Sequence, residues 1–339
     1  MSKIVGIIAN PAAGKDIRRL VAQAATVADH AKVSIVAQAL AGLGAVGIER
    51  ALIMPDLQQL GNKASQRLQR GQQRLPEVDV LDGAVKGTAL DSTHAAQEMR
   101  IRGAGAIIVL GGDGTARAVS KGAGEVPLLC VSTGTNNVLP VFVEGTIAGM
   151  AAGVVALGLV ARDAVACRSK WLGVAVDGRE LDLALVDVGL LKSQFVGAAA
   201  VWSMASLRHL WVTRAEAHSV GLTSIAATQG IIGPRDPWGR WVTLGTRSET
   251  GPLAVLAPGL VEPTNITASH ELWKERPSAV ELTEPGALAL DGEREHMLRA
   301  GAHLQVTLHL DGPWLIDPQA AMRAWAELGL QQLNDRGDR

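Results

Sequence analysis

Short apolar runs alternate with helix-forming stretches up to about residue 165, and this alternation limits the possible folds more than any other feature. Strands that are apolar on both faces belong in a parallel sheet, and the helices between them cover both faces of that sheet. The predicted strands are residues 3–9, 51–55, 78–82, 106–112 and 126–132. The predicted helices lie within residues 10–30 and in 57–75, 91–103 (capped by Asp91 or Ser92), 115–122 and the apolar run 146–161. The first part of the chain is therefore predicted to be an α/β domain with a parallel sheet.

The pattern changes after about residue 165. Short alternating strands with Gly and Pro turns follow, among them an Asp177-Gly178 hairpin signal, and they indicate an antiparallel, sandwich-like arrangement. A helix is expected over 197–216, and a last helix from Pro318 to about Leu333 is expected to pack back on the first domain. We therefore expect an α/β domain over residues 1–164, a β-rich domain over 165–317, and a C-terminal helix and tail over 318–339.

Composition excludes several functions. Apolar residues make up 47% of the 339 residues and the net charge is -1, so a large core is possible and a nucleic-acid binder is not expected. The longest apolar run, 146–161, is too short to span a membrane, which predicts a core helix and no membrane insertion. The two cysteines, Cys130 and Cys167, stand far apart and are expected as thiols in the cytoplasm.

The stretch VLGGDGTARAVS, residues 109–120, has the strongest chemical signal. A predicted strand ends, glycines follow, and a predicted helix begins, so backbone N–H groups and the positive helix end suit a phosphate. Thr115 is expected to cap this helix through its hydroxyl. Asp113 would repel a phosphate unless it held Mg²⁺ or accepted a proton from an attacking hydroxyl. The alternative is a helix cap in a tight turn.

Three further motifs lie at predicted strand ends or turns. NPAAGK at 10–15 and STGTNNVLP at 132–140 follow predicted strands, and the second should lie beside the Asp113 loop. Its amides suit a ribose or a base, although an Asn-rich turn is the alternative. LALDGERE at 288–295 is either a hairpin turn or a pair of carboxylates that bind a metal or orient an acceptor. By contrast, GLGAVG at 42–47 matches the dinucleotide fingerprint but precedes a strand, so we expect a flexible loop there.

The order NPAAG, GGDGT, TGTNN and LDGE resembles the NAD kinase and diacylglycerol kinase superfamily, over about residues 7 to 295. Longer stretches, such as GLGAVGIERALIMPD, are similar to its acetoin-catabolism X branch. The resemblance implies an N-terminal α/β nucleotide-binding domain and a β-rich domain with the site between them, and it implies ATP, Mg²⁺ and homo-oligomers. It implies catalytic roles for Asp113 and Glu293, and Asp291 as metal ligand. The nucleotide- and phosphate-binding residues that it implies are Asn10, Gly14, Gly111, Gly112, Gly114, Thr115, Thr133, Gly134, Thr135, Asn136, Asn137 and Asp187.

The default reaction implied by the resemblance is phosphorylation of NAD to NADP. One departure bears on the acceptor: NAD kinases carry an Asn-Glu pair that helps to bind NAD, where this chain has Val186 and Asp187 within ALVDV. A valine side chain neither donates nor accepts a hydrogen bond. Two alternatives therefore stand beside the NAD kinase: a kinase for another small hydroxyl metabolite, acetoin-related or lipid, and a nucleotide-binding regulator of acetoin catabolism without catalysis.

Overall fold

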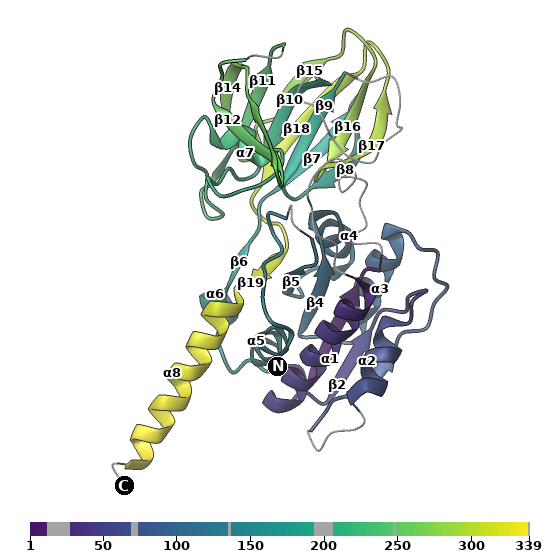
Figure 1. Cartoon of the computed structure of the whole chain (residues 1–339), viewed down its shortest axis with the longest axis vertical. Helices are drawn as coiled ribbons and strands as arrows, with labels where there is room; N and C mark the ends of the chain where they lie inside the picture. The colour runs from purple at the N-terminus through teal and green to yellow at the C-terminus, as the bar shows by residue number, and fades with distance from the viewer. Residues whose placement is uncertain (12–27, 69–73, 135–136, 193–205, 247–248, 338–339) are drawn as a thin grey trace.

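Seven strands form the sheet of the N-terminal domain, in the order β3-β2-β1-β4-β5-β19-β6 (Figure 1). The structure is a computed structural model that describes residues 1–11, 28–68, 74–134, 137–192, 206–246 and 249–337, apart from the side chains of 293–295 and 330–337. The strands of this sheet are β1 (Ile4–Ala9), β2 (Arg50–Ile53), β3 (Glu77–Val80), β4 (Ala106–Gly111), β5 (Leu128–Ser132), β6 (Ala166–Arg168) and β19 (Trp314–Ile316). The pairs among β1 to β5 are parallel, and every residue of β4 and β5 is buried. The predicted parallel sheet is confirmed.

Helices cover both faces of this sheet. They are α1 (Asp29–Val46), α2 (Leu60–Leu68), α3 (Ala89–Ile101), α4 (Asp113–Ala123), α5 (Gly145–Ala156), α6 (Arg162–Val165) and α8 (Pro318–Gly337). Side chains of α1, α2, α5 and α8 share one core cluster with the sheet, and those of α3 and α4 share the other. The apolar run that begins at Thr146 forms most of α5, and α8 packs against α5, so the predicted core helix and the return of the last helix are confirmed. No helix in the described part of the chain is long and apolar enough to span a membrane.

The GLGAVG stretch is helical, so the prediction of a flexible loop was wrong. Residues 42–46 form the last turns of α1, and Gly47, with φ 97°, is its left-handed C-cap. A Cβ at Gly42 would collide with the Thr146 carbonyl oxygen, and one at Gly44 with the Arg74 carbonyl oxygen. The glycines therefore let α1 lie against its neighbours backbone to backbone. Most of the helix predicted within 10–30 falls on residues 12–27, outside the described residues.

Local capping also differs from prediction. The N-cap of α3 is Thr88 rather than Asp91 or Ser92. Asp91 lies in the first turn, where its Oδ2 accepts the N–H of Gly87 at 2.7 Å. A carboxylate in the first turn stabilises the exposed N–H groups and the positive end of the helix from inside it.

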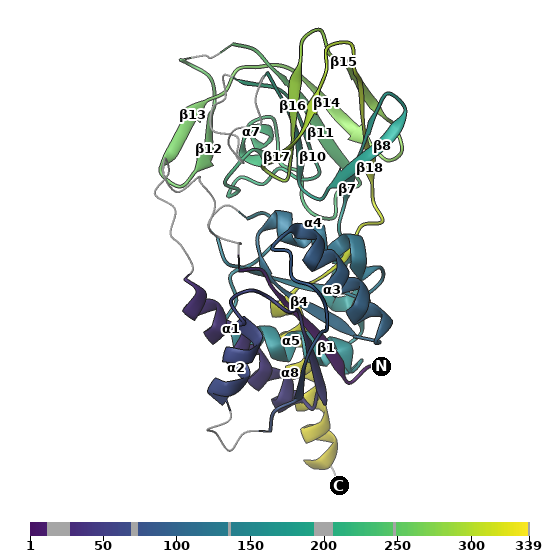
Figure 2. The same cartoon turned by 90° about the vertical axis from the view of Figure 1, so that its right-hand side faces the viewer.

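The C-terminal domain is an antiparallel sandwich (Figures 1 and 2). One sheet has the order β14-β11-β10-β9-β16-β17, the other β15-β18-β7-β8, and β12 and β13 form a separate pair. The elements are β7 (Trp171–Val176), β8 (Arg179–Ala184), β9 (Asp187–Leu191), β10 (Leu207–Val212), α7 (Thr223–Ala227), β11 (Trp238–Leu244), β12 (Leu253–Ala257), β13 (Leu260–Pro263), β14 (Ile266–Trp273), β15 (Ser278–Glu281), β16 (Gly286–Leu290), β17 (Glu293–Leu298) and β18 (His303–His309). Apolar side chains from both sheets form one core between them, as the sequence pattern predicted.

The prediction of a helix over 197–216 was wrong for residues 207–212, which lie in the described part of that range. Residues 207–212 form β10, which pairs with β9 and β11 in the interior of the six-stranded sheet. Leu207, Leu210, Trp211 and Val212 are buried, Trp211 in the sandwich core and the other three in the core cluster that includes α7. A strand buried on both faces has no polar alternation, so its pattern was mistaken for that of a helix.

Two segments cross between the domains. β6 and β19 pair with one another and continue the N-terminal sheet, although both fall in the range expected for the β-rich domain. The chain therefore leaves the α/β domain after Arg168 and returns at Trp314. Figures 1 and 2 show α4 on the side of the α/β domain that faces the β-rich domain.

We predict that Gly42→Ala destabilises the protein. The methyl group gains helix propensity but must push α1 away from the α5 backbone, a net cost of about 1–3 kcal/mol in the free energy of unfolding. Gly329→Ala is the matched control, because Gly329 lies in α8 and nothing stands within 4 Å of its added Cβ. Urea unfolding of the two variants should show opposite signs, and equal effects would contradict the proposed close packing.

Candidate active site

The loop between β4 and α4 brings backbone rather than side chains to the carboxyl edge of the sheet. Gly111 ends β4 and Gly112 is the N-cap of α4. A Cβ at Gly112 would lie 2.9 Å from Asn137 Oδ1, and one at Gly111 would lie 2.5 Å from the Thr115 side chain. Glycine therefore allows β4, α4 and the loop after β5 to pack closely. The first N–H groups and the positive end of α4 lie at this edge, as a phosphate site requires.

Asp113 is the first residue of α4 and its side chain is almost completely buried. Leu139 N–H donates to Oδ1 at 2.8 Å and Val138 N–H donates to Oδ2 at 2.9 Å. Burial and the charge of Asp291 raise the pKa of Asp113, the N–H of Leu139 opposes both, and the resulting pKa is about 6. A carboxyl with this pKa is mostly ionised at neutral pH and is still basic enough to accept a proton.

The loop after β1 is tied to α4. Asn10 Nδ2 donates to Thr115 Oγ1 at 3.0 Å, so the Thr115 hydroxyl does not cap the helix as predicted. Beneath it, the fully buried Lys32 donates from Nζ to the carbonyl oxygens of Asn10 at 3.1 Å and Pro11 at 2.9 Å. The structure thus brings Asn10 and Thr115 together, because β1 and β4 are neighbouring parallel strands. Gly14 lies outside the described residues.

The loop after β5 completes this edge. Asn137 Nδ2 donates to Ser132 Oγ at 2.7 Å, and Ser132 Oγ donates to the Gly134 carbonyl oxygen at 2.8 Å. The Thr133 hydroxyl is fully buried and has no hydrogen-bond partner among the described residues. A buried hydroxyl without a partner is costly and marks a place where a ligand oxygen fits. Thr135 and Asn136 lie outside the described residues.

The DGE turn between β16 and β17 faces this edge from the β-rich domain. Asp291 has φ 50° and is buried, and its carboxylate accepts the N–H groups of Leu185 at 3.2 Å and Val186 at 2.8 Å. Asp187 accepts the Asp291 N–H on its carbonyl oxygen at 2.9 Å, and its Oδ1 accepts the Gly292 N–H at 3.2 Å. Asp187 therefore holds the turn in place. The Glu293 side chain lies outside the described side chains.

Arg117 on α4 joins the two domains and was not among the predicted site residues. Its Nε lies 3.5 Å from Asp291 Oδ2 and its Nη1 lies 3.7 Å from Asp182 Oδ2. Lys121, one turn further along α4, lies 2.5 Å from Asp182. Positions 113, 117 and 121 repeat every four residues and share one helix face, so this spacing was the signal available in the sequence.

Asp291 is not a free metal ligand in this geometry. Its two oxygens accept N–H groups from residues 185–187 and face Arg117, and burial raises its pKa. Among the described residues, no three His, Cys, Asp or Glu side chains gather as a metal site. The assignment of Asp291 to Mg²⁺ remains a prediction, and we derive no chemical step through the metal.

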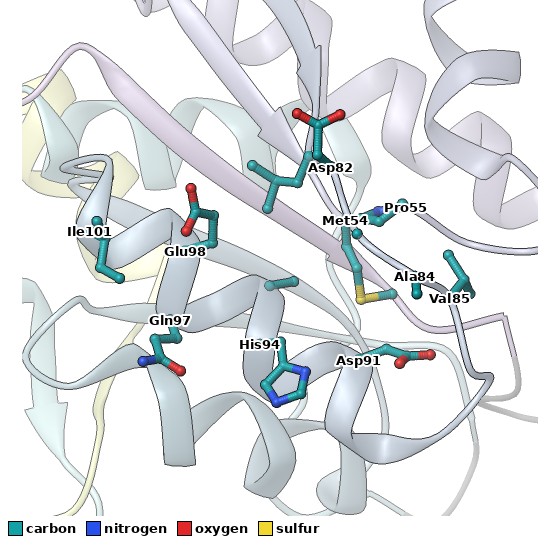
Figure 3. Close-up of a pocket in the computed structure, with 13 residues that line it drawn as sticks. Met54, Pro55, Asp82, Ala84, Val85, Asp91, His94, Gln97, Glu98 and Ile101 are labelled. Atoms are coloured by element: carbon teal, nitrogen blue, oxygen red, sulfur yellow. The ribbon is translucent and has the colours of Figure 1, made fainter.

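A separate hollow of about 340 Å³ lies beyond the carboxyl ends of β2 and β3 (Figure 3). Asp91, His94 and Glu98 reach it from α3, and Asp82 and Val85 come from the loop after β3. None of the residues predicted from the motifs lines it. The candidate site is therefore the edge around Asp113.

Comparison with known proteins finds a family match in each half of the chain. Residues 5–159 match the ATP-NAD kinase N-terminal domain family, and residues 170–311 match the acetoin catabolism protein X C-terminal domain family. Acetoin catabolism protein X of Cupriavidus necator is 38% identical over 332 residues, which cover 95% of this chain and 92% of that protein. The crystal structure of yeast NADH kinase complexed with NADH covers 96% of this chain and 87% of its own, with a TM-score of 0.54 at 14% identity. That likeness shows the fold alone.

We predict that Asp113→Asn changes the pH dependence of stability. Because burial raises the pKa of Asp113 from 3.8 to about 6, the folded protein keeps a proton that the unfolded chain releases in this window. Wild-type stability therefore falls as pH rises from about 4 to 6, by about 3 kcal/mol at most, and the variant escapes this loss.

Urea unfolding at pH 4, 5, 6 and 7 measures the difference between the two proteins. Asp163→Asn, at a side chain that is 77% exposed, is the control. The stability of Asp113→Asn relative to wild type should rise with pH and then level off. A constant difference over this range would contradict burial of the Asp113 charge.

Proposed function

The chain belongs to the acetoin catabolism protein X family, and we propose that it is an ATP-dependent kinase that transfers a phosphoryl group to a hydroxyl. The observation that carries the proposal is Asp113, a buried carboxyl with a raised pKa at the N-terminus of α4. In this reaction Asp113 accepts the hydroxyl proton, the oxygen attacks the γ-phosphorus, and the bond to the β-phosphate oxygen breaks with its electrons on ADP.

ATP fits the edge around Asp113. The N–H groups at the start of α4 offer donors to phosphate oxygens, and the buried Thr133 hydroxyl has no other partner among the described residues. Asn10, Gly134 and Asn137 come from the neighbouring loops and are proposed to hold the nucleotide with Gly111, Gly112, Gly114 and Thr115. When bound, Mg²⁺ neutralises phosphate charge in such reactions. We keep Asp291 and Glu293 as the proposed carboxylates near it.

NAD is the default acceptor, but Val186 favours another one. Its side chain is buried in the same core cluster as Leu185, Leu139 and Cys130, so it contacts apolar groups. The polar side chain expected of an NAD kinase at this position is absent. A small hydroxyl compound, for which the name of the acetoin catabolism relative suggests a diol or hydroxyketone, is therefore the second candidate acceptor.

The other class of function is a nucleotide-binding regulator without catalysis. It would need the backbone phosphate site, but it would not need a buried carboxyl whose ionised form costs stability. The buried carboxyl of Asp113 therefore favours an enzyme over a regulator without catalysis. Homo-oligomers and a cytoplasmic location remain part of the proposal.

We predict that Asp113→Asn lowers turnover by about 10²–10⁴-fold, the contribution of a general base. Asparagine keeps an oxygen for the N–H groups of Val138 and Leu139 but does not accept the proton. ATP turnover with Mg²⁺ is measured against NAD, sugars, short diols and acetoin, with Asp163→Asn as the control. Full activity of Asp113→Asn would exclude the base, and ATP binding without turnover on any acceptor would favour the regulator.

We predict an acidic limb in the pH–rate profile. Since the raised pKa of Asp113 is about 6, the base is protonated below that pH, and kcat should fall about tenfold per pH unit there and level off above it. The measurement is made at saturating ATP, so that ionisation of free ATP does not affect kcat. A profile that stays flat down to pH 5 would contradict Asp113 as the base.

A further inference from the structure

Arg214 lies where the β-rich domain meets the candidate site, directly after β10. Both of its chain neighbours are fixed. Thr213 donates its N–H to the Val186 carbonyl oxygen at 2.9 Å and its hydroxyl to the Leu185 carbonyl oxygen at 2.8 Å. Ala215 and Ile232 exchange N–H and carbonyl bonds at 2.9 and 2.8 Å. The backbone at Arg214 is thus held against the segment whose N–H groups bind Asp291.

The Arg214 side chain is buried without adequate partners. The residue is 8% exposed, and Nε has no hydrogen-bond partner among the described residues. Its ion pair is with Glu216, where Nη1 and Oε2 are 3.9 Å apart, too far for a hydrogen bond. A guanidinium carries five N–H donors, and burying it unpaired is costly. A guanidinium in this state has N–H donors suited to an oxyanion.

The charge of Arg214 acts on Asp113. The Arg214 charge lowers the pKa of Asp113 and the Asp113 charge raises that of Arg214, against larger effects of burial on both groups. Yet no ion pair within 4.0 Å joins these two described residues. The two charges therefore influence one another without forming an ion pair.

Lys170 adds a second buried cation. Its Nζ donates to the carbonyl oxygens of Gly233 at 3.0 Å and Trp238 at 2.9 Å. Burial first, and then the charge of Arg214, lower the pKa of Lys170 to about 8, although the charges of Asp236 and Glu216 oppose this. Two like charges held this close repel each other, and an anion beside Arg214 would relieve the repulsion.

We propose that Arg214 is a catalytic residue that contacts the oxygens of the transferred γ-phosphoryl group. This rests on the proposed function. As the acceptor oxygen bonds to phosphorus and the bond to ADP breaks, negative charge spreads over the phosphoryl oxygens, and the guanidinium donates hydrogen bonds to them without changing its own protonation. An arginine supplied from within the chain has this role in other phosphoryl-transfer enzymes.

Binding of ATP and of ADP, each with Mg²⁺, tests the proposal by calorimetry. Arg214→Met should weaken ATP binding at least tenfold and leave ADP binding unchanged, because only ATP carries the γ-phosphate. The ATP affinity of Arg214→Lys should fall between those of Arg214→Met and wild type, since lysine keeps the positive charge but loses the paired N–H donors of the guanidinium. Arg299→Met, at a side chain that is 77% exposed, should change neither affinity.

Thermal melting without ligand separates this role from a structural one. Removing a buried charge with one long ion pair should raise the melting temperature of Arg214→Met, whereas loss of an arginine that stabilises the fold would lower it. Equal loss of ATP and ADP binding, or a lower melting temperature, would overturn the proposal. If Arg214→Met instead binds both nucleotides as wild type does but no longer binds inorganic phosphate, Arg214 binds an anionic group of the acceptor, and the γ-phosphoryl assignment fails. Wild-type protein that binds neither nucleotide would refute the proposed function itself.

Discussion

The ion pair between Arg117 and Asp291 is the contact on which the candidate site depends. α4 begins at Asp113 and carries Arg117 one turn later, so the helix that presents the proposed base also carries the link to the other domain. On the opposite side, Asp291 is fixed by N–H groups of residues 185–187, the segment between β8 and β9. Because β8 and β9 belong to different sheets of the sandwich, one buried carboxylate joins both sheets to α4. The distance between the domains is therefore set at the position where the chemistry is proposed.

This arrangement has an electrostatic consequence. A buried ion pair gives little net stability, since desolvation offsets much of the attraction, but it fixes geometry. Here it also places the charge of Asp291 near Asp113, which contributes to the raised pKa of Asp113, while Arg214 opposes that rise. The basicity of Asp113 thus depends on groups of the second domain. A site built in this way exists only when the two domains are docked, which agrees with the direct packing of Leu185 and Val186 into the core of the first domain.

The sequence predicted the parallel sheet because its strands are short, apolar and separated by helices. It also predicted that the loop with Asn137 would lie beside the Asp113 loop, because neighbouring parallel strands end at one edge. It failed where tertiary contacts override local pattern. β10 is buried on both faces, so apolar and polar residues do not alternate along it. The last turns of α1 contain glycines, which indicate a loop unless a helix such as α5 packs against them. Arg214 follows a strand that had been taken for a helix, so no motif placed it. Its significance comes from burial and an unmatched Nε, which only coordinates reveal.

Val186 shows how a relative of NAD kinases can keep the chemistry and change the acceptor. Its N–H still donates to Asp291, so the backbone role of this position is independent of the side chain. The side chain itself lies in the core with Leu139 and adds apolar contact between the domains. The proposed phosphoryl site, formed by backbone, Asp113 and Arg214, is therefore separable from recognition of the alcohol. Selection can alter the acceptor at positions such as 186 without disturbing the fixed carboxylate, and an acetoin-associated branch of a kinase superfamily is expected to differ from its relatives there.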